Sequence, residues 1–293
     1  MKWHLTGRKN IFYAGLVFLL VLFSIMLVDF WGRGIWNEKL GLNLLVVGDD
    51  GVAILTLRPK EEEITWTVLP KDLKIKISGS TAMYPIGSLW KFARGERAQY
   101  LISEKTVGES VGVILPRVIK MMGDVSVENL MGQLMSLKAD TDLSVSDRWN
   151  VRKFMTSSGA SRHIVEYELP QQVFDKVVEA DGKEFKVFSS SVYSWVKNKF
   201  VMEAVLSEKA EIVVNNTSGI KGAGLVLSSQ LESAGMRVVD IKNDETDKVS
   251  GKGCVYWLPK TYESSAKVLN DYFGCKRLGR ELDGLTGGKV WLQ

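Results

Sequence analysis

Hydrophobic and polar positions divide the chain into one long apolar run and a series of shorter strand-like and helix-like segments. The run from Ile11 to Val28 contains no charged residue. In a helix it covers roughly 27 Å, and continuing it to Trp31 takes it past the ~30 Å hydrocarbon core of a bilayer. The pattern therefore predicts a transmembrane helix over residues 11–31.

The flanks of this run indicate its orientation. Lys2, Arg8 and Lys9 precede it, whereas the charges that follow it balance. The positive-inside rule then places residues 1–10 in the cytoplasm and the rest of the chain outside. A cleaved signal peptide is the alternative, but the bulky aromatics of DFWGRGIW make a poor cleavage site. We expect an uncleaved, single-pass anchor in the cytoplasmic (inner) membrane, followed by a glycine-containing linker over residues 32–41.

Beyond the linker, short β-rich runs alternate with helix-compatible segments. Strands are predicted at Leu42–Gly48, Val52–Arg58 and Ile64–Leu69, the last two joined by a charged turn. Helices are predicted within 90–122 with interruptions at the glycines, at 126–138 behind Ser126, at 146–155 behind Ser146 and Asp147, and at 190–206. Shorter strands are predicted at 164–169, 173–180 and 185–188. This mixture predicts one α/β domain over residues 42–206.

The last part of the chain, residues 208–293, has a more regular pattern. Strands are predicted at 211–215, 236–241, 254–258 and 289–292, with helices at 225–234 and 264–273 that end at glycines. This order is β-α-β repeated twice. It predicts a separate, small two-layer α/β domain, so the fold class as a whole is α/β behind a membrane anchor.

Composition and charge exclude some functions. Of 293 residues, 45% are hydrophobic and 25% charged, which is typical of a folded protein. The net charge is +4, and three of the cations lie in the first ten residues. The remainder is close to neutral and has no electrostatic footprint for nucleic acid, so we expect no nucleic-acid partner.

The two cysteines, Cys254 and Cys275, lie at related points of the second domain. Cys254 begins a predicted strand and Cys275 follows the next predicted helix. In a strand–helix return these points meet at one end of the sheet, so a disulfide is geometrically plausible and is chemically permitted outside the cytoplasm. Two buried free thiols are the alternative.

The C-terminal pattern resembles a known module. Asn215-Asn216-Thr217, then Gly222, Leu231, Gly235 and Val238, with Tyr256, Ala266, Leu269 and Phe273 later on, are similar to the C-terminal module of LytR-CpsA-Psr proteins. Upstream, Leu44–Asp50 and Val68–Asp72 resemble, more faintly, the opening strand and the Pro-Arg-Asp segment of the family's catalytic domain. The family's usual layout also places a membrane anchor before both domains.

The resemblance implies an envelope function. Active members are expected to hold a polyprenyl-pyrophosphate-linked glycan and transfer its glycan phosphate to peptidoglycan, with arginines and Mg²⁺ neutralising the pyrophosphate and aspartates holding the metal. The corresponding candidates here are Asp49 and Asp50 for Mg²⁺, and Lys71, Asp72, Arg94 and Arg97 for phosphate. Asp49-Asp50-Gly51 is equally a common tight-turn sequence. An ion pair of Lys71 with Asp72 at an exposed strand end is likewise the simpler interpretation of those two residues.

The chain departs from the family where phosphate is held. The arginine-bearing loop between the first two strands is reduced to Asp49-Asp50-Gly51, and lysine occupies position 71. Lysine is a point charge that does not reproduce a bidentate phosphate clamp. The sequence therefore favours a non-catalytic binding or scaffold role in cell-wall glycopolymer assembly. The expected partners are a glycopolymer, a polyprenyl-linked lipid or an envelope protein, and an active phosphotransferase is the alternative.

Two further functions are weaker. Gly219, Gly222 and Gly224 lie between a strand and a helix, but their order is not that of a dinucleotide fingerprint, and close helix–strand packing explains them equally well. Cytoplasmic transcriptional regulation, suggested by the family's older label, conflicts with the predicted topology.

Overall fold

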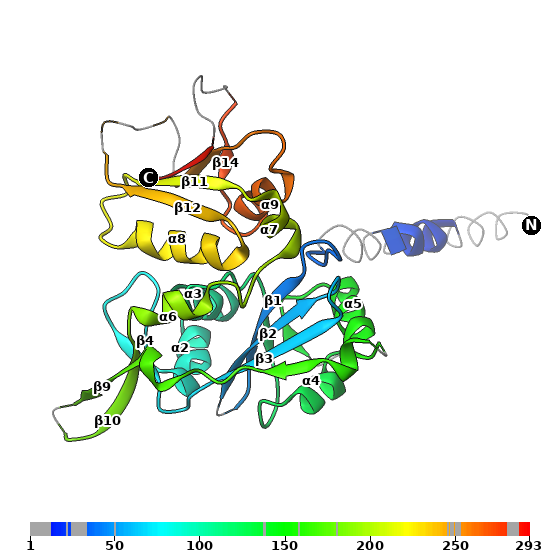
Figure 1. Ribbon diagram of the computed structural model, residues 1–293. Coiled ribbons are helices and arrows are strands. Elements are labelled where there is room, and N and C mark those ends of the chain that lie inside the picture. The colour runs from blue at the N-terminus through cyan, green and yellow to red at the C-terminus, as the bar shows by residue number, and fades with distance from the viewer. Residues whose placement is uncertain are drawn as a thin grey trace, which may run out of the picture.

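The computed structural model describes residues 13–21, 23–24, 34–49, 51–136, 139–157, 159–179, 181–244, 246, 249, 253–279 and 287–293. Residues 13–21 are helical and exposed, and the chain extends from them to a folded body with two main sheets (Figure 1). Within these ranges no helix is both long enough and apolar enough to cross a membrane. The rest of the predicted span 11–31 lies outside the described residues.

The first sheet has six strands. They are β1 (Leu42–Val47), β2 (Val52–Arg58), β3 (Glu63–Leu69), β6 (Val118–Lys120), β7 (Asp140–Thr141) and β8 (Ile164–Glu166), in the order β7-β6-β1-β2-β3-β8. β1, β2 and β3 form an antiparallel meander, while β6 pairs in parallel with β1 and β8 in parallel with β3. The carboxyl ends of β1, β3, β6 and β8 therefore share one edge of the sheet.

Helices cover both faces of this sheet. One face carries α2 (Leu89–Gly95), α3 (Gln99–Val111) and α6 (Ser191–Val196), and the other carries α4 (Val127–Gln133) and α5 (Val145–Met155). Leu45 and Ile54 point to the first set, and Leu44 and Leu55 to the second. Burial on both faces explains why the central strands are continuous apolar runs without alternation.

Shorter elements complete this part of the molecule. They are the hairpins β4 (Lys74–Lys76) with β5 (Met83–Pro85) and β9 (Phe174–Val178) with β10 (Glu184–Phe188), and the 3₁₀ turns η1 (Ile86–Ser88), η2 (Ala160–Arg162) and η3 (Gln171–Val173). The β9–β10 hairpin extends away from the body (Figure 1). The predicted strands over 42–69 are thus confirmed, as is the strand at 185–188, whereas those at 164–169 and 173–180 are shorter than expected.

Three helix predictions are corrected. The segment 90–122 contains α2, α3 and then β6, because Gly112 adopts a left-handed backbone (φ 81°) that ends α3. α5 is capped by Ser144, whose Oγ accepts a hydrogen bond from the Asp147 amide (3.0 Å), and not by Ser146. The segment 190–206 is not one helix. It splits into α6 and α7 (Glu203–Glu208), because Asn198 has φ 64° and the chain between them buries Phe200.

The second sheet has five strands in the order β12-β11-β15-β13-β14. Its elements are β11 (Glu211–Asn216), α8 (Ala223–Ala234), β12 (Arg237–Lys242), β13 (Cys254–Trp257), α9 (Glu263–Asp271), β14 (Lys276–Arg277) and β15 (Gly288–Leu292). β11 and β12 are parallel, as are β13 and β14, which gives the two predicted β-α-β units. The sequence assigned the final strand to the second unit. Instead β14 closes that unit, and β15 lies in the middle of the sheet between β11 and β13.

Cys254 and Cys275 form a disulfide in the structure, with their Cα atoms 4.4 Å apart. Cys254 begins β13 and Cys275 directly precedes β14. Because these strands are parallel, their first residues lie at the same end of the sheet. The disulfide therefore fixes the start of the two-residue strand β14.

The two sheets are joined by a packed interface. α8 lies between its own sheet and α3 (Figure 1). The Gln230 side chain donates to the Val113 carbonyl (3.4 Å), and Lys197 pairs with Glu232 (2.9 Å). Leu40, which precedes β1, is buried in the core of the five-stranded sheet. Side chains from both parts of the chain thus share one apolar cluster.

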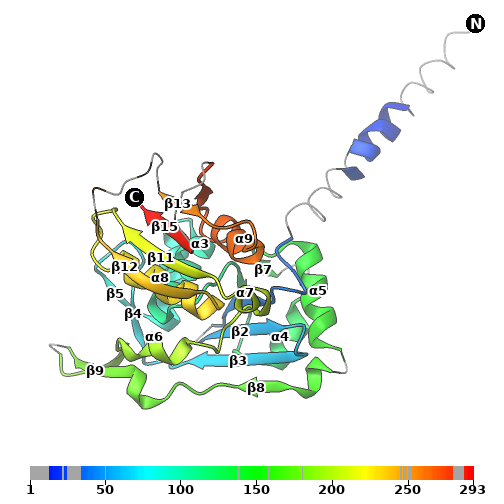
Figure 2. The same ribbon diagram turned by 45° about the horizontal axis from the view of Figure 1, so that its top comes forward.

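The linker between the N-terminal helix and β1 is held by one buried carboxylate. Asp147 Oδ1 accepts the backbone N–H groups of Ile35 (2.9 Å) and Trp36 (2.8 Å), and its Oδ2 accepts the Ser144 hydroxyl (2.7 Å). Asp147 is fully buried. Its place in the first turn of α5 also favours a negative charge. The chain therefore joins the body beside α5 (Figure 2).

Candidate functional site

Charged residues gather where the parallel strands of the six-stranded sheet end. Val47 is opposite both Lys120 of β6 and Val52 of β2, and Val52 is opposite Leu69 of β3. Asp49 therefore lies next to the end of β6. Lys71 follows the end of β3, which lies two strands, or about 10 Å, across the sheet from β1. This edge is the candidate site predicted from the sequence.

Asp49 forms the best-defined contact at this edge. Lys120 Nζ donates to Asp49 Oδ1 (2.6 Å) and to the Met121 carbonyl (2.6 Å), and the Gly123 amide donates to Asp49 Oδ2 (2.6 Å). The hydrogen bond from Lys120 holds the pKa of Asp49 below its usual range, with smaller effects from Gly123 and from the charge of Lys91. Asp49 is mostly exposed, whereas the Lys120 side chain is largely covered.

This arrangement does not form a ready Mg²⁺ site. Both oxygens of Asp49 accept hydrogen bonds, so a metal ion would have to displace the Lys120 ammonium group. The described part of the chain holds no group of three histidine, cysteine, aspartate or glutamate side chains able to bind a metal. Asp50, the second candidate ligand, lies outside that part.

Asp72 contacts a lysine of the β9–β10 hairpin. Asp72 Oδ2 accepts Lys186 Nζ (3.1 Å), and the Asp72 carbonyl accepts the Lys186 amide (3.1 Å). Lys186 belongs to β10 and lies over the Phe174 ring at 5.7 Å. Asp72 thus ties the β9–β10 hairpin to the end of β3. Lys71 is exposed at the same edge.

The arginines proposed as replacements lie on and after α2. Arg94 is exposed in the last turn of α2, and Arg97 is exposed in the following loop with φ 57°. The cation of α2 that acts on Asp49 is Lys91, one turn before Arg94 on the same helix face. Lys91 and Lys120 were missed by the sequence analysis. Lys120 ends a three-residue strand, and a charged residue at a strand end was the signal that could have identified it. That signal was hidden because the segment was predicted to be helical.

A second group of charged residues lies near β6 and β7 and contains two partly buried carboxyl groups. The pKa of Glu104 on α3 is raised to about 8, mainly by burial and also by the Asp142 carboxylate, while Arg117 and Lys105 oppose the shift. Burial also raises the pKa of Asp142, although its Oδ1 accepts the Val118 amide (2.8 Å) and Arg117 lies 3.8 Å away. Glu104 Oε2 has no hydrogen-bond partner. We expect this cluster to make the stability of the fold depend on pH.

The Asn-Asn-Thr motif of the C-terminal part has a structural role. Asn215 exchanges hydrogen bonds with the backbone of Asp244 (3.1 and 3.0 Å), Asn216 Nδ2 donates to the Ile220 carbonyl (3.0 Å), and Thr217 Oγ1 donates to the Leu292 carbonyl (2.8 Å). These contacts fix the loops at the end of β11.

The glycines that follow this motif also serve packing. A Cβ atom at Gly224 would lie 3.1 Å from Ile241 Cγ2 and 3.2 Å from Asn216 Cβ. Gly219 and Gly222 have left-handed backbones, with φ 73° and 85°. Close helix–strand packing therefore accounts for Gly224, and the left-handed backbone accounts for Gly219 and Gly222.

Comparison with known proteins gives structural matches alone. No family model matches the sequence, and no curated protein matches it. Twenty-four chains of solved structure do match. TagT from B. subtilis is 14% identical over 57% of this chain and 92% of its own, with a TM-score of 0.42. TagV from B. subtilis is 8% identical over 53% and 94%, with a TM-score of 0.41.

A further match of the same kind is a LytR-CPS2A-psr family protein, YwtF (TagT), with bound octaprenyl pyrophosphate lipid. It is 14% identical over 57% of this chain and 92% of its own, with a TM-score of 0.41. The solved structures to which the chain is similar thus include LytR-CPS2A-psr proteins, the family whose motifs its sequence resembles.

Proposed function

We propose that this chain is a membrane-anchored, extracytoplasmic envelope protein of the LytR-CpsA-Psr type that binds cell-wall glycopolymer precursors without catalysing their transfer. The observation that supports it is the composition of the strand edge. Lys91 and Lys120 surround Asp49, and Lys71 lies two strands away. This edge attracts an anion, but lysines supply most of its positive charge.

The contrast with a transferase lies in how that charge is arranged. Phosphoryl transfer depends on positioning and on neutralising the charge that develops on the phosphate. Lysine ammonium groups are strongly hydrated point charges without the planar fork of arginine. Asp49, a carboxylate of this edge, is paired with Lys120. Such a site would retain affinity for pyrophosphate without a bidentate arginine clamp on it.

The anchor is part of the same proposal. The uncharged run Ile11–Val28 has the length of a membrane span. Phe18, Leu19 and Phe23 in its described part are each at least 60% exposed. Exposed aromatic and aliphatic side chains on one helix are costly in water and favourable in lipid. Protease digestion of spheroplasts tests the orientation: the folded body is expected to be cleaved from outside, and protection would contradict it.

The binding proposal is tested with the full chain in detergent micelles and a short polyprenyl pyrophosphate, by isothermal titration calorimetry with and without Mg²⁺. We expect saturable binding that Mg²⁺ does not tighten. Lys120→Gln and Lys91→Gln should each weaken it about tenfold, the scale of one charge-assisted hydrogen bond. Lys153→Gln, an exposed lysine on α5, is the matched control and should bind like the parent chain.

The opposite outcomes are distinct. Metal-tightened binding that Asp49→Ala abolishes, together with transfer of a glycan phosphate to peptidoglycan fragments, would replace the binding role with the phosphotransferase alternative. Absence of binding by a chain with an unchanged circular dichroism spectrum would remove the strand edge as a pyrophosphate site.

A further inference from the structure

The outer face of α5 presents apolar and cationic side chains together. The exposed residues Val145, Trp149, Arg152 and Thr156 are spaced by three or four positions, so they form one stripe along the helix. Trp149 is 56% exposed and Val145 is 44% exposed. Nothing in the described part of the chain covers this stripe.

The linker holds this helix close to the proposed membrane anchor. A Cβ atom at Gly34 would lie 3.3 Å from Asp147 Oδ1, in the first turn of α5, and the Trp36 ring lies 5.8 Å from that of Phe154 in the last turn. The linker thus follows α5 from its first turn to its last, and the chain enters the body beside this helix (Figure 2). Residue 31, where the predicted span ends, is three positions before Gly34, a reach of about 10 Å. The first turns of α5 are therefore kept near the membrane surface.

The charges of α5 favour an anionic partner. Arg152 is exposed and, among the residues that the structure describes, has no ion-pair partner. Arg148, on one flank of the stripe, donates to the Ser136 carbonyl (3.1 Å) and keeps its charge. The one acidic residue of α5, Asp147, is buried on the opposite side and accepts the linker amides. Lys153 lies on the other flank, where it lines a hollow beside the linker.

This combination suits the interface between a bilayer and water. Tryptophan is enriched at the level of the lipid head groups, because its ring is apolar and its indole N–H is polar. Arginine donates to phosphate oxygens and is attracted to an anionic leaflet. A single ring and a single cation bind a membrane weakly. In an anchored chain they are already at the surface, so that weak contacts are enough to orient the body.

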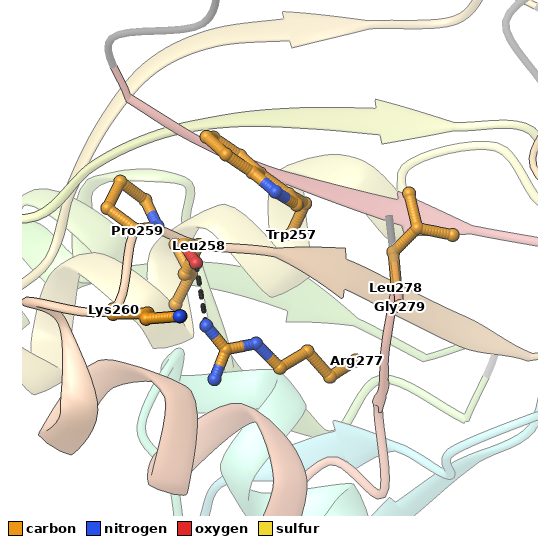
Figure 3. A pocket seen from close by; sticks show the side chains of 7 residues that line it. All are labelled: Trp257, Leu258, Pro259, Lys260, Arg277, Leu278 and Gly279. Carbon is orange, nitrogen blue, oxygen red and sulfur yellow. Dashed lines mark hydrogen bonds between the residues drawn. The ribbon is translucent and has the colours of Figure 1, made fainter. Parts of the chain in front are cut away.

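The hollow at the ends of β13 and β14 lacks this combination. Its cation Arg277 lies opposite Tyr256, so the ring of Trp257, the next residue of β13, belongs to the other face of the sheet (Figure 3). Arg277 also donates to the Leu258 carbonyl (3.0 Å). It is an exposed arginine with no exposed tryptophan on its own face, and is therefore a matched comparison for Arg152.

We propose that the outer face of α5 lies on the lipid surface of the membrane that holds the anchor, with Trp149 at the level of the head groups and Arg152 on the phosphates of anionic phospholipids. The inference rests on the anchor of the proposed function and goes beyond it, because it gives the folded body one orientation on the bilayer. It shares no residue with the strand edge of the six-stranded sheet.

The test places a fluorophore on the stripe. The two native cysteines are bonded to each other, so the thiol of Val145→Cys can be labelled selectively with NBD in the full chain. The labelled chain is reconstituted into vesicles of phosphatidylcholine with a nitroxide on its head group, with or without phosphatidylglycerol. We expect the nitroxide to quench the fluorophore strongly when phosphatidylglycerol is present. The same label at Leu101→Cys, an exposed position of α3 on the other face of the sheet, should not be quenched.

Substitutions on the stripe distinguish docking from mere closeness to the tether. Arg152→Gln should lower the ratio of docked to undocked chains about fivefold, the effect of one cation beside an anionic leaflet. Trp149→Ser should lower it about tenfold, as for loss of a large apolar contact, and Trp149→Phe should keep most of the docking. Arg277→Gln should leave the ratio unchanged. All four residues changed are exposed or half-buried, and an unchanged circular dichroism spectrum confirms the fold of each variant.

Two outcomes would overturn the proposal. The first is quenching that changes neither with phosphatidylglycerol nor with Trp149→Ser and Arg152→Gln, because the tether alone would then explain it. The second is an equal loss for Arg152→Gln and Arg277→Gln, which would indicate general charge attraction.

Flotation with the vesicles separates this inference from the anchor. A chain that floats but is not quenched at position 145 contradicts docking and leaves the anchor intact. A chain that does not float contradicts the anchor and docking together. Lys120→Gln should leave the quenching unchanged, so that a failure of pyrophosphate binding at the strand edge is read separately.

Discussion

The buried carboxylate of Asp147 determines how firmly the linker is held to the body. Asp147→Ala removes the acceptor of the Ile35 and Trp36 amides and of the Ser144 hydroxyl. A hydrogen bond to a charged group contributes about 1.5–3 kcal/mol, and a buried donor left without a partner costs about 1–3 kcal/mol. The linker residues are half-buried, so water can replace part of the loss. We therefore expect about 3 kcal/mol for the substitution.

The assay is hydrogen exchange of the full chain in micelles, followed by mass spectrometry of the peptide that contains Ile35 and Trp36. A loss of about 3 kcal/mol corresponds to exchange on the order of 100-fold faster at these two amides. Asp147→Asn keeps an oxygen for the two amides but loses the charge, and should give about a tenfold increase. Asp175→Ala, an exposed aspartate on β9, is the control and should change neither amide.

The reasoning would be refuted by unchanged exchange at Ile35 and Trp36 in Asp147→Ala with the fold intact. It would also be refuted if Asp175→Ala accelerated exchange equally, because the effect would then be general destabilisation. Slower exchange in Asp147→Asn would show that burying the charge costs more than its hydrogen bonds return.

Three further predictions concern stability. Replacing Cys254 and Cys275 by serine removes a cross-link between residues separated by 21 positions in the sequence. The free energy of unfolding in urea should fall by about 3 kcal/mol. An unchanged midpoint of unfolding would contradict this. Gly112→Ala places a side chain at a left-handed position against α8 and should lower the free energy of unfolding by about 2 kcal/mol or more. Gly132→Ala, in open space on α4, should be neutral or stabilising. Because the folded chain raises the pKa of Glu104 from 4.5 to about 8, it binds more protons than the unfolded chain in that window, so stability should fall as pH rises from 4.5 to 8. Glu104→Gln should flatten this slope in thermal melts, and an unchanged slope would assign it to other groups.

Local patterns predicted the parts of the fold that depend on neighbouring residues. The apolar runs of β1, β2 and β3 and the glycine-ended helices α8 and α9 follow from segment patterns alone. The geometry of a β-α-β unit made the Cys254–Cys275 bond plausible, and the structure decides for it over two free thiols. The helix expected at 190–206 failed because its apolar spacing fits a helical period, and only the tertiary burial of Phe200 breaks it.

The candidate site was less accessible to sequence reasoning, because its contacts join distant segments. Asp49 was identified from its turn, but its partner Lys120 is 71 positions away and lies on a strand too short to recognise. Asp147 was noted as a helix cap, whereas its linker partners are more than 100 positions away. No local pattern encodes such contacts.

The burial of Leu40 in the core of the five-stranded sheet has a mechanical consequence. Lys39, beside it, accepts the Ala204 amide through its carbonyl (3.2 Å). A force applied to the five-stranded sheet would therefore reach residues 39 and 40 through these contacts as well as along the backbone through the six-stranded sheet. The segment that enters β1 would be loaded together with the five-stranded sheet.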